Sequence, residues 1–287
     1  MDSVTSYIRE SACSSEIVSL FPVREVYWKQ ATTYADCVIA EVPGLGRTLF
    51  IDNEVQSAAE DEDIYHECLV HPVMAAARSR DSVLVVGGGE GATVREVLKW
   101  ADVGVVDWVD IDGELVEACR AHLGWAEEAM YSDPRVRFHA EDIRRFLKRS
   151  PTAYNVVLID LPDPDPEAIL EGEGAEETLM NAAFWRAVGA HLAPGAVWAT
   201  HTGPVRRRGP SGAAVISRGA AAAGLSVGAH YHAVIRSFQD DWGFAMSVPP
   251  LPTLPTSIAP LRFLGAAAYD CVFRWPWDAG SGASEAT

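Results

Sequence analysis

The sequence predicts an α/β protein in which a doubly wound sheet follows a small antiparallel β unit at the N-terminus. Two patterns support this fold class. Between residues 23 and 58, short runs of β-branched and aromatic residues alternate with turn residues, which is typical of antiparallel strands. From residue 82 onward, apolar runs alternate with longer amphipathic stretches, which is typical of parallel strands joined by helices.

The individual elements follow from the same patterns. In the N-terminal unit, strands are expected at residues 25–28, 37–40 and 48–51, with turns at 43–46 and 52–53. A helix should follow at 61–77, because acidic residues suit a helix N-terminus and apolar residues recur on one side. The strands of the large sheet are expected at 83–86, 104–109, 136–139, 155–159, 196–200, 226–234 and 242–247. The intervening helices are expected at 92–100, 114–122, 143–148, 177–191 and 211–223.

Composition limits the class of protein. Hydrophobic residues make up 48% of the chain and no apolar run reaches membrane-spanning length, so we expect a globular cytoplasmic protein without a membrane partner. A formal net charge of −17 opposes binding to a nucleic-acid backbone and attracts small cations, although acidity also serves solubility. The five cysteines lie far apart without metal-ligand spacing, so free thiols and no metal site are expected.

A glycine-rich turn follows the first strand of the large sheet. Gly87, Gly89 and Gly91 stand between this strand and a predicted helix, where glycine permits a tight turn and close approach of a nucleotide. About 20 residues later, Asp110 and Asp112 end the next strand, where a carboxylate accepts hydrogen bonds from ribose hydroxyls. This pairing favours a Rossmann-like nucleotide site over an ordinary βαβ turn. The glycine spacing alone leaves NAD and S-adenosyl compounds open.

Further acids follow the third and fourth strands. Asp142 either accepts a hydrogen bond from adenine or caps the helix that begins after it. Asp160, Asp163 and Asp165 alternate with prolines at the carboxyl end of the fourth strand, and open parallel sheets present this end to the ligand crevice. Because these like charges repel, a bound cation or a general base with a raised pKa is indicated. An acidic surface turn is the alternative.

Longer motifs carry a resemblance to a known family. Residues 51–67 contain Gln56, Asp61-Glu62 and Tyr65-His66-Glu67 in order, followed by the glycine-rich turn, Asp110-Ile-Asp112 and Asp160-x-x-Asp163-Pro164. In these motifs, between about residues 34 and 244, the chain resembles the spermidine synthase family of polyamine aminopropyltransferases. The resemblance implies a class I S-adenosylmethionine-type fold, no metal, and a homodimer formed through the N-terminal strands.

The resemblance implies a donor site for decarboxylated S-adenosylmethionine. Asp110 would bind ribose, Asp142 adenine and Gln56 the nucleoside, beside the loop of Gly87, Gly89 and Gly91. Glu90 takes the place of the family's aspartate near the aminopropyl amine. Methyltransferases of this fold usually have an acid at the position of Val85 and a small residue at that of Glu90, the reverse of this chain.

On the acceptor side, the resemblance implies that Tyr65, Asp160 and Asp163 line a small-molecule amine, with Asp160 as general base. An S-adenosylmethionine-dependent methyltransferase or 3-amino-3-carboxypropyl transferase acting on a specialised metabolite is the alternative. A non-catalytic binder of nucleotides or polyamines is less favoured, because a binder has little need of a base.

The chain departs from the family pattern in four segments. The family's Tyr-Gln is Tyr34-Ala35 here, and the catalytic loop lacks a glycine after Asp163. The family's Gly-Glu segment is replaced by residues 200–204, which include His201, and its Pro-Thr-Tyr-Pro segment by residues 236–241. His201 either faces the crevice or makes an ordinary hydrogen bond. The arginines at 206–208 suit solvent or a carboxylate on the acceptor.

The resulting division has three parts. Residues 1–60 form the β-strand unit, residues 61–250 the Rossmann-like nucleotide-binding catalytic domain, and residues 251–287 a tail. The tail contains Pro-Pro-Leu-Pro and ends in glycine, serine and alanine, so partial disorder is expected there.

Overall fold

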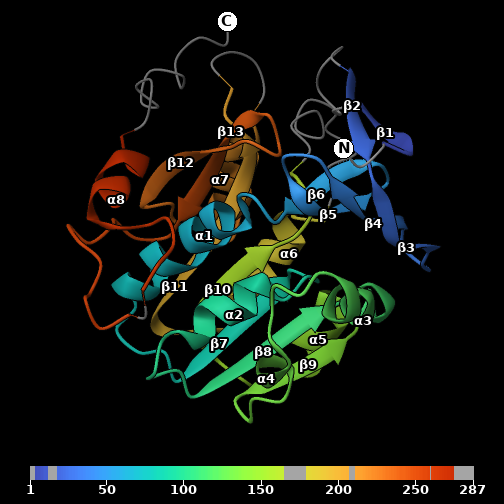
Figure 1. Cartoon of the computed structure of the whole chain (residues 1–287). Coiled ribbons are helices and arrows are strands. Elements are labelled where there is room, and N and C mark those ends of the chain that lie inside the picture. Colours follow the sequence, from blue (N-terminus) through green and yellow to red (C-terminus); the bar gives the residue numbers. More distant parts are fainter. Residues whose placement is uncertain (1–3, 12–17, 165–178, 207–210, 259, 275–287) are drawn as a thin grey trace, which may run out of the picture.

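The computed structural model describes residues 4–11, 18–164, 179–206, 211–258 and 260–274. At its centre is a seven-stranded sheet with the order β12-β13-β11-β10-β7-β8-β9 (Figure 1). Its strands are β7 (Ser82–Gly87), β8 (Val105–Asp110), β9 (Val136–Ala140), β10 (Tyr154–Asp160), β11 (Leu192–Pro204), β12 (Ala229–Ile235) and β13 (Asp240–Met246). β13 is antiparallel to both neighbours, while β11, β10, β7, β8 and β9 are mutually parallel. The predicted doubly wound sheet is confirmed.

Helices cover both faces of this sheet. On one face lie α1 (Glu62–Ala76), α2 (Ala92–Leu98), α3 (Gly113–His122), α4 (Glu128–Tyr131) and α8 (Ala266–Val272). On the other face lie α5 (Ile143–Arg149), α6 (Ala182–Ala190) and α7 (Gly212–Ala222). In β7, Val83 and Val85 face the first layer, and Leu84 and Val86 face the second. Both faces are apolar because a sheet covered by helices on both sides has no solvent face.

Helix α1 is more deeply buried than its sequence indicated. An apolar side was expected, but nearly the whole circumference is buried, including the polar side chains of Glu62, His66, Glu67 and His71. Burial of charged groups is costly unless they are paired. These side chains therefore hydrogen-bond to one another and to neighbouring segments.

The N-terminal unit is a four-stranded antiparallel sheet preceded by a hairpin. The sheet contains β3 (Glu25–Ala31), β4 (Asp36–Val42), β5 (Gly46–Ile51) and β6 (Glu54–Ala58), in that order. Its three expected strands are confirmed, and Asp52 and Asn53 turn the chain at positive φ (51° and 68°), which suits a tight hairpin. The hairpin of β1 (Ser6–Ser11) and β2 (Val18–Val23) was not predicted.

No helix or strand was predicted after residue 249, but α8 lies there. Leu264, Tyr269 and Val272 join the core against α1. Helix α4 was likewise unexpected, and the disorder predicted for the last residues falls outside the described ranges.

Two sequence expectations concern the whole chain. The four described cysteines are free, and Cys13 lies outside the described residues. Among the described residues, every helix is too short or too polar to span a bilayer.

Candidate active site

The site lies at the carboxyl ends of β7 and β10, where the chain order in the sheet changes direction. In open α/β sheets, ligands bind at this switch point. Gly87 pairs with Asp160 across the two strands. Gly87 and Gly88 have φ of 81° and 67°, and a Cβ atom on them would lie 2.1 Å from the Asp160 carbonyl oxygen and 2.8 Å from its Oδ2, respectively. Glycine therefore lets the turn lie directly against Asp160.

Asp160 is held by two hydroxyl groups from separate helices. Tyr65 in α1 donates to Oδ1 over 2.7 Å, and Thr93 in α2 donates to Oδ2 over 2.5 Å. Burial raises the pKa of Tyr65 well above its ordinary value, and the negative charge of Asp160 adds to this shift. Tyr65 therefore remains a neutral hydrogen-bond donor. The two contacts fix the orientation of the Asp160 carboxylate.

Glu90 is paired with His66, a residue that was named in the sequence only as part of the Tyr-His-Glu motif. His66 Nε2 lies 2.9 Å from Glu90 Oε1, and His66 Nδ1 lies 2.6 Å from the Glu62 carbonyl oxygen. Because a carbonyl oxygen only accepts hydrogen bonds, the proton in the contact with Glu62 is on His66 Nδ1. The contact between His66 Nε2 and Glu90 Oε1 needs a proton as well, on either Nε2 or the carboxyl group. Burial lowers the pKa of His66, but hydrogen bonds to Glu62 and Glu90 outweigh it and raise the pKa to about 10. The geometry favours an imidazolium beside a carboxylate.

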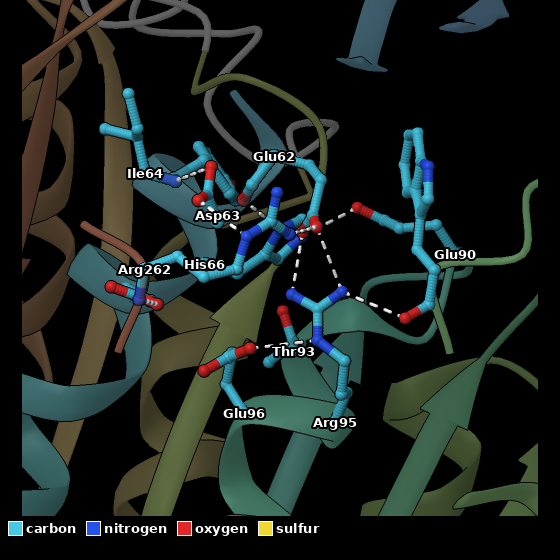
Figure 2. A network of polar contacts seen from close by, with 12 residues as sticks. Glu62, Asp63, Ile64, His66, Glu90, Thr93, Arg95, Glu96 and Arg262 are labelled. Carbon is cyan, nitrogen blue, oxygen red and sulfur yellow. Dashed lines mark hydrogen bonds and ion pairs between the residues drawn. The ribbon is translucent and has the colours of Figure 1, made fainter. Parts of the chain in front are cut away.

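A buried ion network supports this pair, and Figure 2 shows Arg95 between Glu62 and Glu96. Arg95 donates to Glu62 through both terminal nitrogens, at 3.1 and 2.7 Å, and to Glu96 through Nε at 2.9 Å. Arg262 adds a contact to Glu62 at 3.1 Å. Burial raises the pKa of Glu62, but hydrogen bonds from His66 and Arg95 lower it to about 2. Glu62 is thus a fixed anion beneath His66.

Asp110 ends β8 beside the glycine-rich turn. Its Oδ1 accepts a hydrogen bond of 2.8 Å from the backbone N–H of Asp112, and its Oδ2 would lie 3.2 Å from a Cβ atom on Gly89. Burial raises the pKa of Asp110 to about 7, with further contributions from the negative charges of Glu90 and Asp160. The structure thus brings Asp110, Glu90 and Asp160 into one acidic cluster.

Other predicted site residues lie outside this cluster. Asp142 caps α5 by accepting from the Arg144 N–H at 2.7 Å, and it also pairs with the Arg144 side chain. The capping interpretation is confirmed, and contact with adenine stays a prediction. Gln56 is half-buried in the edge strand β6. Gly91 is the N-cap of α2 at φ 80°, and a Cβ atom on it would lie 3.0 Å from the Met130 side chain and 3.2 Å from the Tyr131 hydroxyl.

Asp163 lies three residues beyond Asp160, and its side chain is 53% exposed. Its Oδ1 is 3.6 Å from Nδ1 of His201, and His201 Nε2 donates to the Leu161 carbonyl at 2.6 Å. The next acid of the loop, Asp165, lies outside the described residues.

Sequence reasoning missed His66 and Thr93 as site residues. His66 follows Tyr65 directly in the recognised Tyr-His-Glu motif, and Thr93 is three residues after Glu90 in the first turn of α2. Both positions were therefore available as signals. What the sequence did not give was the tertiary contact that each residue makes.

The site also satisfies the spacing for a small cation. Ligand atoms of His66, Glu90 and Asp160 lie within 4.8 Å of one another. Because both nitrogens of His66 already donate hydrogen bonds, only the Glu90 and Asp160 carboxylates are acceptors for an ammonium group or ligands for a metal ion. The expectation that no metal takes part remains a prediction.

Comparison with known proteins identifies the family. A spermine/spermidine synthase domain matches residues 62–209, which is more than half of the chain. The chain belongs to the spermine/spermidine synthase family. Within this family, polyamine aminopropyltransferase 2 of Hyperthermus butylicus is 35% identical over 94% of this chain and 90% of the relative. Polyamine aminopropyltransferase 2 of Pseudomonas aeruginosa is 36% identical over 82% of this chain and 65% of the relative.

Solved structures of the family share the fold. A spermidine synthase in complex with the transition-state analogue AdoDATO superposes with a TM-score of 0.84 at 21% identity, covering 96% of this chain and 94% of that one. The spermidine synthase of Thermotoga maritima gives 0.81 at 18% identity, covering 96% and 93%. The class I S-adenosylmethionine-type sheet with its small N-terminal antiparallel unit is therefore the family fold.

Proposed function

We propose that this transferase moves an aminopropyl group from decarboxylated S-adenosylmethionine to a small-molecule amine and releases methylthioadenosine. The observation that carries the proposal is the Asp160 carboxylate, which Tyr65 and Thr93 fix at the switch point beside Glu90. A fixed carboxylate suits proton abstraction, and an acidic cluster suits the two cationic substrates.

The reaction is an in-line displacement at the carbon beside the sulfonium. The nitrogen of the acceptor forms a bond to this carbon, the carbon–sulfur bond breaks, and its electron pair stays on the sulfur of methylthioadenosine. Asp160 accepts the proton that the amine loses. Tyr65 and Asp163 line the acceptor, and most of the acceleration comes from holding nitrogen and carbon in reactive alignment.

The donor occupies the glycine-rich side of the site. Asp110 accepts hydrogen bonds from the ribose hydroxyls, Asp142 contacts adenine and Gln56 contacts the nucleoside. Gly87, Gly89 and Gly91 allow close approach of the backbone. Glu90, held by His66, accepts the ammonium of the aminopropyl tail.

The charge on Glu90 favours the decarboxylated donor. Two like charges about 4 Å apart repel by roughly 4 kcal/mol at an effective dielectric constant of 20, and opposite charges attract equally. S-Adenosylmethionine would bring a second carboxylate toward Glu90, whereas the decarboxylated form brings only an ammonium. The imidazolium of His66 reduces this difference, because it neutralises part of the Glu90 charge.

Product analysis tests the proposal. The protein is incubated with each donor and a panel of amines, with and without a chelator, and products are identified by mass spectrometry. An amine extended by one aminopropyl group, formed only from decarboxylated S-adenosylmethionine and unaffected by the chelator, is the expected result. Products of methyl or 3-amino-3-carboxypropyl transfer from S-adenosylmethionine would replace the proposal by the alternative activity.

We also propose a homodimer that pairs through the N-terminal strands. Large apolar side chains are exposed there, with Tyr7 64% and Leu20 62% accessible on the β1–β2 hairpin. One face of the hairpin packs on the four-stranded sheet through Phe21 and Val23, and the exposed apolar side chains of the hairpin would be stabilised by a partner surface. Light scattering should give the dimer mass, and Leu20→Arg should shift it toward the monomer. A monomer mass for the unaltered protein at all concentrations contradicts this assembly. A cytoplasmic location stays a prediction.

A further inference from the structure

Two segments that depart from the family pattern meet beside Tyr65. The ring of His201, in β11, stacks on Trp242 in β13 at a centroid distance of 6.2 Å. Trp242 contacts Phe238 at 4.6 Å, and Tyr65 contacts both Phe238 and His201 at 5.9 Å. Each of these four rings therefore contacts two of the others, and the Tyr65 hydroxyl donates a hydrogen bond to Asp160. The two altered segments therefore form one wall next to the reacting centre.

His201 has one satisfied and one unsatisfied nitrogen in this wall. The residue is 3% exposed, and its Nε2–H donates to the Leu161 carbonyl at 2.6 Å. Its Nδ1 is buried and has no hydrogen-bond partner. When the proton is on Nε2 and Nδ1 carries none, Nδ1 is an acceptor, and a buried acceptor without a donor is unfavourable. A ligand with an N–H group would satisfy it.

Asp163 supplies a second acceptor at the same place. Its Oδ1 lies 3.6 Å from His201 Nδ1, beyond hydrogen-bond distance, and neither acceptor can serve the other while Nδ1 lacks a proton. The Asp163 side chain is 53% exposed, whereas His201 is held by its contacts with the Leu161 carbonyl and the Trp242 ring. An ammonium group has enough donors to bind both atoms at once.

We propose that His201 determines acceptor specificity by binding, together with Asp163, a second nitrogen of the acceptor that carries N–H groups. The ligand class is a diamine or longer polyamine whose reacting nitrogen lies at Asp160 and whose second, protonated nitrogen lies between His201 Nδ1 and Asp163. The aromatic wall contacts the methylene chain between the two nitrogens. The proposal rests on the proposed aminopropyl transfer. It adds a hydrogen bond that favours a charged nitrogen with N–H groups over a charged nitrogen without them.

Paired substrates and paired variants separate this hydrogen bond from charge and from structure. A diamine is compared with its analogue in which one nitrogen is trimethylated, since that nitrogen keeps its charge but has no N–H. His201→Gln keeps an amide donor near Leu161 and removes the Nδ1 acceptor, whereas His201→Asn places an amide oxygen near the Nδ1 position. Melting temperatures establish that each variant is folded.

We expect His201→Gln to lower kcat/KM for the diamine about 10- to 100-fold, mainly through KM, as loss of a hydrogen bond to a charged group predicts. For the trimethylated analogue, kcat/KM should differ little between His201→Gln and the unaltered protein, and the affinity for the donor should be the same in both. His201→Asn should lose less kcat/KM for the diamine than His201→Gln does. Equal losses for both substrates, or a loss in kcat alone, would overturn the proposal. Failure of the unaltered protein to use any amine would instead count against aminopropyl transfer. Calorimetry of both compounds in the presence of methylthioadenosine then decides the role of His201.

Discussion

Replacement of Asp110 by asparagine should stabilise the free protein while weakening its ligand binding. Burial, aided by Glu90 and Asp160, raises the pKa of Asp110 from 3.8 to about 7. A shift of about three units corresponds to roughly 4 kcal/mol of destabilisation when the carboxylate is ionised in the folded state. Asparagine keeps an oxygen for the Asp112 N–H and removes the charge.

The sign of the pH dependence follows from proton binding. Between pH 4 and 7, the folded state holds this proton more tightly than the unfolded state does, so the penalty grows as pH rises through this interval. Above pH 7 it is constant. Between pH 5.5 and 8.5, the stability advantage of Asp110→Asn should therefore widen by roughly 2 kcal/mol. Measurements begin at pH 5.5 because the isoelectric point is near 4.8.

Two assays check this prediction. Urea unfolding of both proteins across the pH range gives the difference in free energy of unfolding, and calorimetry at pH 8 gives the affinity for methylthioadenosine. We expect Asp110→Asn to be the more stable protein and the weaker binder, by about 1–3 kcal/mol of binding free energy. A stability difference that does not change with pH would refute the assigned pKa. Unchanged affinity would remove Asp110 from the ribose site.

Three further substitutions probe the rest of the site. Asp160→Asn should lower kcat about 10²- to 10⁴-fold with donor affinity nearly intact, and unchanged turnover at neutral pH would make this loop structural. Glu90→Gln should reduce the ratio of affinities for decarboxylated S-adenosylmethionine and S-adenosylmethionine, which titration with both donors measures. If the unaltered protein bound S-adenosylmethionine more tightly, the charge argument for Glu90 would be wrong. Arg95→Met should lower the free energy of unfolding by about 3–5 kcal/mol in urea titration, because the buried Glu62 and Glu96 both lose the guanidinium group that lies between them.

The sequence by itself determined the architecture and the location of the site. Apolar alternation gave the parallel strands, because a sheet covered on both faces needs apolar side chains on both. The glycine-rich turn and the acids at strand ends located the ligand, because a switch point brings the carboxyl ends of neighbouring strands together. The placement of Asp110 and Asp160 at the site was predictable for this reason, because each follows a strand whose carboxyl end lies at this edge of the sheet.

Only the tertiary structure decided which polar groups meet. His66 contacts the Glu62 carbonyl oxygen through Nδ1 and the Glu90 carboxylate through Nε2, and these two contacts together require two protons. The segment that leads into α8 is ordered by Glu67, which accepts three backbone N–H groups from residues 262–264. His201 meets Trp242 across paired strands. Periodicity reports how one element faces the core, whereas these contacts join residues far apart in the chain, so no local pattern encodes them.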